Sequence, residues 1–170
     1  LGLLERLFKS EGQRIAAVIV EPMLGNSFGF MPEPGYLEGI RRLCNQSGSV
    51  LIFDEVKTGF RIAVGGAQEL FGVTPDIGTY AKALGNGFPV AAIATRGDLV
   101  EGWKQGGIAQ AGTYSGNAVA AAAAGATVDQ LMTGEPLARV EKVGKTLMEG
   151  ISGILSDHSV DGIVTGHPSM

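Results

Sequence analysis

Apolar and polar residues form distinct blocks along this chain, and the most informative block covers residues 50–56. Four apolar residues in succession occupy positions 50–53, directly after a glycine and a serine. The run is too short for an independent helix and is typical of a strand buried in a parallel sheet. Asp54 and Glu55 come next. The sequence therefore predicts a buried strand with an acidic carboxyl end.

The remaining blocks predict strands that alternate with helices. Short apolar runs rich in β-branched residues predict strands at residues 15–20, 77–81, 89–95 and 160–164. Apolar residues at helical spacing predict helices at residues 2–12, 36–46, 67–71, 98–103, 118–132 and 136–155. This alternation is typical of an α/β fold, in which a mostly parallel sheet carries helices on both faces.

Three of the predicted strands end in charged residues, namely Glu21, Asp54 and Lys82. The carboxyl ends of parallel strands meet at one edge of a sheet, and ligands of open α/β sheets bind beyond that edge. We therefore expect the three side chains on a single rim. The loop at residues 23–35 is rich in glycine and proline and is long enough to wall a site there, with Asn26 in reach of it.

Asp54 and Lys82 each have a structural explanation as well as a chemical one. Backbone N–H groups or an arginine can satisfy a carboxylate at a strand end, and a lysine there is usually a surface residue. The residues that flank Lys82 are small, however: Ala81, Ala83, Gly85 and Gly87. A lysine that is desolvated in such surroundings becomes a nucleophile for carbonyls. A carboxylate in the same cleft suits pyridoxal 5′-phosphate (PLP), whose protonated ring nitrogen needs an anionic partner.

Composition narrows the possible partners. The net charge of −4 argues against nucleic acid or an anionic membrane, and no stretch predicts a membrane span. The 170 residues have the length of one domain. Cys44 is the single cysteine, which excludes an internal disulfide and fits a reducing compartment, so we expect a cytoplasmic protein. The spacing of Cys44, His158 and His167 does not suit a metal site.

A set of short motifs is distributed over residues 14–132. They are Ile19-Val20-Glu21-Pro22, Gly25-Asn26, Phe53-Asp54-Glu55-Val56, Thr58-Gly59-Phe60-Arg61, Pro75-Asp76 leading to Lys82, and Gly112-Thr113-Tyr114-Ser115-Gly116-Asn117. Together they resemble the class III aminotransferases of PLP fold type I. No single motif would be enough, and the resemblance is specific because the motifs recur in the same order and spacing.

The resemblance implies roles for four residues around the cofactor ring. Lys82 would form the Schiff base with PLP and then move the proton between substrate carbon and cofactor. Asp54 would pair with the pyridinium nitrogen, Val56 would pack against one ring face, and Asn26 would hydrogen-bond the ring hydroxyl. The implied substrate is a small amino acid or amine.

The resemblance also implies two roles away from the ring. Thr113 would reach across a homodimer interface to the phosphate of the neighbouring subunit's cofactor. Glu21 matches an acid that in several members of the family pairs with a substrate-gating arginine from the C-terminal domain. A simple cap at the end of the strand is an equally available role for Glu21.

Lys57 departs from the family pattern, since members of the family carry methionine or glutamine at this position. Its cation could change the substrate pocket or could face solvent, and it is the competing candidate for the Schiff base. Lys57 lies only three residues beyond Asp54, in the same turn. We therefore favour Lys82.

The resemblance covers only part of the family's architecture. A phosphate cup rich in glycine and serine would precede residue 1, and a small domain would follow Met170. Residues 1–165 would then be part of the large PLP-binding domain, and residues 166–170 would begin the connection to the C-terminal domain. We expect these 170 residues alone to bind the cofactor weakly and to turn over no substrate.

The implied activity is PLP-dependent transfer of an amino group. Gly25-Asn26 and the interval of 28 residues from Asp54 to Lys82 most resemble the glutamate-1-semialdehyde aminomutase group of the family. An ω-amino acid or amine:keto-acid transaminase is the alternative. A non-catalytic phosphate- or nucleotide-binding α/β domain is a remote one, because the sequence has neither a Walker pattern nor a G-x-G-x-x-G that opens a helix.

Overall fold

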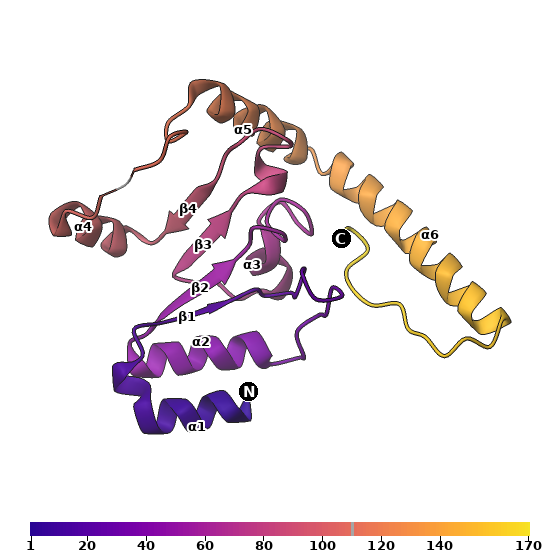
Figure 1. Cartoon of the computed structure of the whole chain (residues 1–170), viewed down its shortest axis with the longest axis horizontal. Coiled ribbons are helices and arrows are strands. Elements are labelled where there is room, and N and C mark those ends of the chain that lie inside the picture. Colours follow the sequence, from indigo (N-terminus) through magenta and orange to yellow (C-terminus); the bar gives the residue numbers. More distant parts are fainter. Residues whose placement is uncertain (110) are drawn as a thin grey trace.

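The computed structural model of the chain describes residues 1–109 and 111–170. Figure 1 shows its elements, which follow the order α1 (Gly2–Glu11), η1 (Gly12–Arg14), β1 (Ala17–Val20), α2 (Tyr36–Ser47), β2 (Val50–Asp54), α3 (Gly66–Phe71), β3 (Ile77–Tyr80), η2 (Lys82–Leu84), β4 (Ala92–Thr95), α4 (Gly97–Gly106), α5 (Ala118–Leu131) and α6 (Glu135–Asp157). All six predicted α-helices are present, with ends shifted by a few residues. Four of the five predicted strands are present as well.

The strands form one sheet in the order β1-β2-β3-β4. The pairs β1-β2 and β2-β3 are parallel, and β4 is antiparallel to β3. The register places Val20 opposite Phe53 and Asp54 opposite Thr79. The prediction of an α/β fold with a mostly parallel sheet is confirmed. Because β1, β2 and β3 run in the same direction, their carboxyl ends lie at one edge of the sheet (Figure 1).

The hydrophobic core lies between this sheet and α2. The helix begins after Gly35 and ends at Gly48, both of which adopt a left-handed backbone that glycine tolerates best. Its buried residues recur at helical spacing and meet alternate residues of β2, and the cluster comprises Leu37, Ile40, Cys44, Leu51, Phe53 and Val73. Complete burial of a side chain such as that of Phe53 contributes about 2 kcal/mol. The core therefore fixes β2 as the central support of the rim.

The opposite face of the sheet is less covered. Ile19 of β1 is 65% exposed, and Ile93 of β4 is 61% exposed. Asp54 lies on this face, because side chains alternate along a strand and the buried Phe53 faces α2. The pleat of β2 thus turns the acidic strand end toward the open side of the sheet.

The C-terminal third of the chain consists of α5, α6 and a returning segment. The predicted strand at residues 160–164 is wrong, since this stretch has no regular secondary structure. A strand needs the backbone groups of a neighbouring strand, and within the described parts of the chain none pairs with it. The segment instead runs back from the end of α6 toward the loop at residues 23–35 (Figure 1), where the Thr165 hydroxyl donates to the Phe28 carbonyl at 2.8 Å. None of the described helices combines the length and apolar character needed to cross a membrane.

Candidate active site

The parallel strands bring three predicted site residues to one edge of the sheet. Glu21 directly follows β1, Asp54 is the last residue of β2, and Lys82 lies two residues after β3. Because β2 lies between β1 and β3, Asp54 occupies the middle of this edge. The rim is the part of the fold where open α/β sheets bind ligands.

Asp54 presents a carboxylate with unused hydrogen-bonding capacity. Its Oδ1 atom accepts the Val56 backbone N–H at 3.0 Å and, at 3.4 Å, the hydroxyl of Thr79 on the neighbouring strand. In the part of the chain that the structure describes, both of these bonds fall on Oδ1, so Oδ2 is available to a ligand. The two protein bonds hold the side chain on the open face of the sheet. Thr79 was not among the predicted site residues, although the strand register places it opposite Asp54.

Lys82 has an unusual backbone conformation. Its φ of 46° lies in the left-handed region, which costs a residue with a side chain about 1 kcal/mol. The Lys82 carbonyl accepts the N–H groups of Gly85 and Asn86, each at 3.1 Å, and these bonds hold the turn. The side chain is exposed, and it makes no ion pair with any described residue. The turn therefore presents a primary amine beyond the carboxyl end of β3, the strand that pairs with β2.

Tyr80 is the last residue of β3, and its buried side chain anchors the end of that strand. Its ring packs edge-on against Phe60 with centroids 5.6 Å apart, and its hydroxyl accepts a hydrogen bond from Gln68 Nε2 at 2.7 Å. Burial and the nearby Glu55 charge raise the pKa of Tyr80 above its ordinary value, while the bond from Gln68 opposes the change. The phenol thus stays neutral at physiological pH. Its packing and its hydrogen bond fix the backbone two residues before Lys82.

The loop that follows β1 is attached to the rim through Glu21. The Gly25 backbone N–H donates to Glu21 Oε2 at 3.1 Å, and Asn26 Nδ2 donates to Glu21 Oε1 at 3.2 Å. Glu21 therefore caps this loop and ties the exposed side chain of Asn26 to the strand end. Its pairing with an arginine of a further domain stays a prediction.

Lys57, the competing candidate amine, is engaged elsewhere. Its Nζ atom donates to the Gly25 carbonyl at 2.9 Å, in a partly buried position. An ammonium used in this way would have to give up a hydrogen bond and leave the loop before it could attack a carbonyl. The Lys82 amine has no such bond among the described residues, and its role as the Schiff-base lysine stays a prediction.

Sequence reasoning missed the structural importance of Glu55. This carboxylate is fully buried, and Oε2 accepts the Thr58 hydroxyl and the Ala67 N–H, both at 2.7 Å. Its Oε1 atom accepts the Gln68 N–H at 3.1 Å. Glu55 therefore joins the turn after β2 to the beginning of α3. The available signal was the acidic pair itself, because neighbouring residues in an extended strand face opposite sides of the sheet.

Thr113 and Val56 occupy different surroundings. Val56 is half-buried in the turn directly after Asp54, and its N–H donates to that carboxylate. Thr113 lies in an exposed turn between α4 and α5, and no hydrogen bond among the described residues joins it to Asp54 or Lys82. The structure therefore places Val56 next to Asp54 at the rim and Thr113 in an exposed turn, and the intersubunit role of Thr113 stays a prediction.

These groups fit the chemistry of the cofactor that the motifs imply. An aldehyde with a basic ring nitrogen needs a primary amine and a carboxylate that has an available oxygen. Lys82 supplies the amine, and Asp54 supplies the oxygen from the adjacent strand end. Within residues 1–109 and 111–170, no group of three or more His, Cys, Asp or Glu side chains is placed to hold a metal ion.

Comparison with known proteins gives a consistent family. The sequence model for the class-III aminotransferases matches residues 2–167. The glutamate-1-semialdehyde 2,1-aminomutase of Methanothrix thermoacetophila is 48% identical over 157 residues, covering 92% of this chain and 36% of that protein. The enzyme of the same name from Pelotomaculum thermopropionicum is 48% identical over 152 residues, covering 89% of this chain and 35% of its own length. The chain thus spans little more than a third of these relatives.

Solved structures with the same fold are transaminases. An ω-transaminase from Sphaerobacter thermophilus superposes with a TM-score of 0.87 at 34% identity, covering 97% of this chain and 38% of that chain. The ω-transaminase of Pseudomonas jessenii, solved in complex with PMP, superposes with a TM-score of 0.85 at 27% identity, covering 98% and 38%. Glu21, Asp54 and Lys82 all lie within residues 2–167, which the family model matches.

Proposed function

Because the chain belongs to the class-III aminotransferase family, we propose that the protein carrying it transfers amino groups with PLP held covalently on Lys82. The observation that supports this most directly is the pairing on neighbouring strand ends. Asp54 directs an available carboxylate oxygen to the open face of β2, and Lys82 offers an exposed amine beyond β3. The remainder of the proposal assigns the other rim residues around this pair.

Each rim residue has one task in the proposed reaction. When bound, the cofactor supplies an electron sink for the bond broken at the substrate carbon. Asp54 holds positive charge at the ring nitrogen, and Val56 packs against the ring and excludes water from one face. Asn26 donates or accepts at the ring hydroxyl. The Lys82 amine, released when substrate binds, takes a proton from the substrate carbon and returns it at another atom.

The proposed substrate is a small amino acid or amine, and the proposed assembly is a homodimer. Thr113 is exposed, as a residue that contacts a second subunit must be before assembly. In the dimer it would bind the phosphate of the neighbouring subunit's cofactor. Glu21 would meet a cation from a further domain when the site closes. The free thiol of Cys44 agrees with a cytoplasmic location, which is also part of the proposal.

The preferred reaction is that of an aminomutase, which returns the amino group to a neighbouring carbon of the same molecule. The supporting observation is the 48% identity to two proteins named glutamate-1-semialdehyde 2,1-aminomutase. Transfer to a keto acid is the second candidate, supported by the 34% identity to an ω-transaminase over 97% of the chain. Conversion of glutamate-1-semialdehyde without an added amino donor or acceptor would decide for the first, and dependence on a keto acid for the second.

The test of cofactor attachment uses the complete protein with PLP. Borohydride reduction followed by peptide mass spectrometry should find an adduct of cofactor mass on the peptide that contains Lys82. Lys82→Ala should lose the adduct, whereas Lys57→Ala, the matched control, should keep it. An adduct that survives in Lys82→Ala and disappears in Lys57→Ala would reverse the assignment. The absence of any adduct in the unaltered protein would favour a non-catalytic phosphate- or nucleotide-binding domain.

The same experiment on residues 1–170 alone addresses the size of the functional unit. The chain spans about 36% of the relatives it matches, so we expect most of the cofactor contacts to be shared with other segments. Residues 1–170 should therefore bind PLP weakly and show no turnover. Steady transamination by this stretch alone would refute that expectation.

A further inference from the structure

Gly25 is held from both sides by charged side chains that follow two different strands, β1 and β2. Its N–H donates to the carboxylate of Glu21, at the end of β1, at 3.1 Å. Its carbonyl accepts from the ammonium of Lys57, in the turn after β2, at 2.9 Å. One peptide residue therefore bridges an anion and a cation. We call Glu21, Gly25 and Lys57 the Gly25 clamp.

We propose that the Gly25 clamp makes Lys57 a positioning residue, which fixes the loop at residues 23–30 and thereby the side chain of Asn26. The clamp gives Lys57 a role that the sequence alone did not suggest, beside a pocket cation, a solvent-facing charge and the competing Schiff-base amine. The part of the inference that concerns Asn26 and the cofactor rests on the proposed function. The part that concerns the order of the loop does not.

The packing around Gly25 supports this role for the lysine. A Cβ atom added at Gly25 would lie 2.7 Å from Lys57 Cδ, 2.8 Å from Met170 Cε and 3.2 Å from Lys57 Cβ, so the aliphatic stem of Lys57 packs against the loop backbone beside the end of the Met170 side chain. Such close approach is possible because Gly25 has no side chain. The lysine thus contributes both an apolar stem that covers the glycine and an ammonium that binds its carbonyl.

The clamp extends to Asn26 through the second oxygen of Glu21. Asn26 Nδ2 donates to Glu21 Oε1 at 3.2 Å, while Oε2 takes the Gly25 N–H. Both carboxylate oxygens are therefore committed to two successive residues of the loop. With its amide nitrogen held by Glu21, Asn26 has its carbonyl oxygen available for a ligand. Its orientation then depends on the position of Gly25, which Lys57 holds from the other side.

Apart from the clamp, the loop is tied, among the described residues, to the C-terminal segment and not to the sheet, since the Thr165 hydroxyl donates to the Phe28 carbonyl at 2.8 Å. Its own backbone bonds are local, with Leu24 N–H donating to the Phe30 carbonyl at 3.0 Å and Gly29 N–H to the Leu24 carbonyl at 3.1 Å. Phe28 is 84% exposed and has a φ of 58°, so the tip gains little from burial. A loop of this kind opens easily unless polar contacts hold it. Loss of the ammonium should therefore be visible locally.

The experiment measures amide hydrogen exchange of the complete protein without cofactor. Lys57→Met keeps the apolar stem but removes the donor, and should raise exchange across residues 24–30 about tenfold, which corresponds to about 1.4 kcal/mol. Lys57→Arg keeps a donor and should stay within about threefold of the unaltered protein. Lys104→Met is the control, because the Lys104 ammonium pairs with the exposed Glu101 on α4 and should not affect the loop.

A second variant tests the other charged residue of the Gly25 clamp, Glu21. Glu21→Gln places an amide NH₂ against either Gly25 N–H or Asn26 Nδ2, so a donor then faces a donor. Exchange in residues 24–30 should rise as in Lys57→Met. The double variant should rise less than the product of the two single effects, because both act on the same peptide. Multiplicative effects would show that the two residues act independently and would overturn the clamp.

Two further outcomes separate the inference from the proposed function. Unchanged exchange in Lys57→Met, or an equal increase in α2, would overturn the clamp, since a local device must act locally. Cofactor affinity, measured by absorbance titration of the complete protein with PLP, should fall at least about threefold in Lys57→Met. If exchange in residues 24–30 rises but the affinity for PLP is unchanged, Lys57 does not position Asn26 for the cofactor. The borohydride adduct on Lys82 would then still test the proposed function separately.

Discussion

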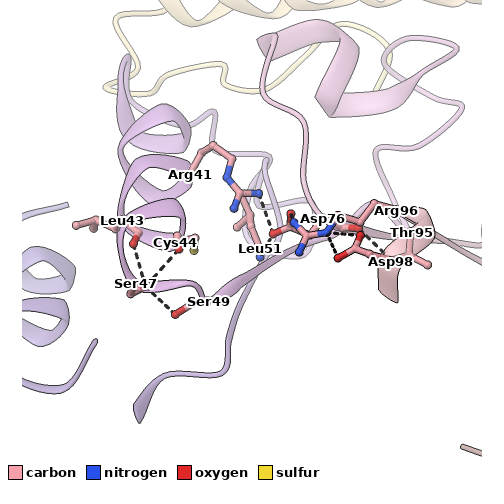
Figure 2. Close-up of polar contacts among 10 residues, drawn as sticks. All are labelled: Arg41, Leu43, Cys44, Ser47, Ser49, Leu51, Asp76, Thr95, Arg96 and Asp98. Carbon is pink, nitrogen blue, oxygen red and sulfur yellow. Dashed lines mark hydrogen bonds and ion pairs between the residues drawn. The ribbon is translucent and has the colours of Figure 1, made fainter. Parts of the chain in front are cut away.

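Asp76 is a buried carboxylate whose replacement should cost the fold several kcal/mol, and it lies at the amino end of β3, opposite the end that leads to Lys82. It precedes β3, and its side chain is only 8% exposed (Figure 2). Oδ2 accepts the Leu51 N–H at 2.7 Å and Arg41 Nη1 at 2.9 Å, while Oδ1 accepts from Arg96 Nη1. One carboxylate therefore joins α2, β2 and the end of β4. Asp76→Asn removes its charge with little change in shape.

The expected cost follows from what the substitution leaves behind. Removal of one partner from a buried ion pair costs about 3–5 kcal/mol, because the remaining charge is uncompensated. Arg41 is the sensitive partner, since its side chain is 19% exposed and its Nε atom is already buried without a hydrogen bond in the described structure. Arg96 is 52% exposed and can turn to water. We therefore expect about 3 kcal/mol, the lower end of the range.

Urea unfolding at pH 7 measures this cost. With a slope of about 2 kcal/mol per molar urea, the midpoint should fall by about 1.5 M in Asp76→Asn. Asp98→Asn is the matched control, because Asp98 pairs with the same Arg96 but is 63% exposed, so its loss should cost less than about 1 kcal/mol. Equal midpoints for the two variants would refute the assignment of Asp76 as a buried electrostatic junction.

The same pair of proteins makes a prediction about pH. Burial alone would raise the pKa of Asp76, but the Leu51 N–H, Arg41 and Arg96 outweigh it, and the net pKa lies below its ordinary value. An acid with a lowered pKa stabilises the folded state fully above its unfolded pKa of about 3.9 and loses that contribution as pH falls through the folded pKa. The difference in stability between the unaltered chain and Asp76→Asn should therefore narrow below about pH 4. A difference that widens there would contradict the argument.

Three further predictions concern other parts of the fold. Burial raises the pKa of the Cys44 thiol against the opposing charge of a nearby arginine, so a thiol reagent such as DTNB should react at least about 100-fold more slowly with the native than with the urea-unfolded chain. Gly66→Ala should lower the free energy of unfolding by about 2 kcal/mol or more, because φ is 71° and the added Cβ would collide with Glu55 Oε2. Arg61→Ala should speed proteolysis of the last residues of the chain, because Arg61 Nε donates to the Ser169 carbonyl at 2.7 Å.

Much of the fold could be predicted because its signals are local. The apolar run at residues 50–53 has the length of a strand, and Leu37, Ile40 and Cys44 recur on one face of a helix, so both elements follow from spacing alone. Parallel pairing then follows from the alternation of strands and helices. The edge that carries Glu21, Asp54 and Lys82 could be predicted for the same reason, since parallel strands must end together.

The predictions that failed or were missing depended on partners distant in the sequence. Residues 160–164 have the composition of a strand, but a strand exists only where another strand offers its backbone groups, and none of the described strands does so here. The contact between Lys57 and the Gly25 carbonyl joins residues 32 positions apart. No spacing rule identifies such a pair, which depends on the adjacency of β1 and β2 and on a loop that folds back over both.

The acidic pair after β2 explains why one carboxylate at this rim can serve a ligand. Asp54 and Glu55 are adjacent, yet the extended backbone turns them to opposite faces of the sheet. Glu55 is fully buried and accepts three hydrogen bonds, which fix the turn after the strand. Among the described residues, Asp54 accepts bonds on Oδ1 alone, and it faces the open side. A binding site can hold a charge at a fixed point when the carboxylate that binds it is supported by rigid, fully hydrogen-bonded neighbours. The ability of Asp54 to bind a ligand thus depends on the hydrogen bonds that Glu55 accepts, because those bonds fix the turn after β2.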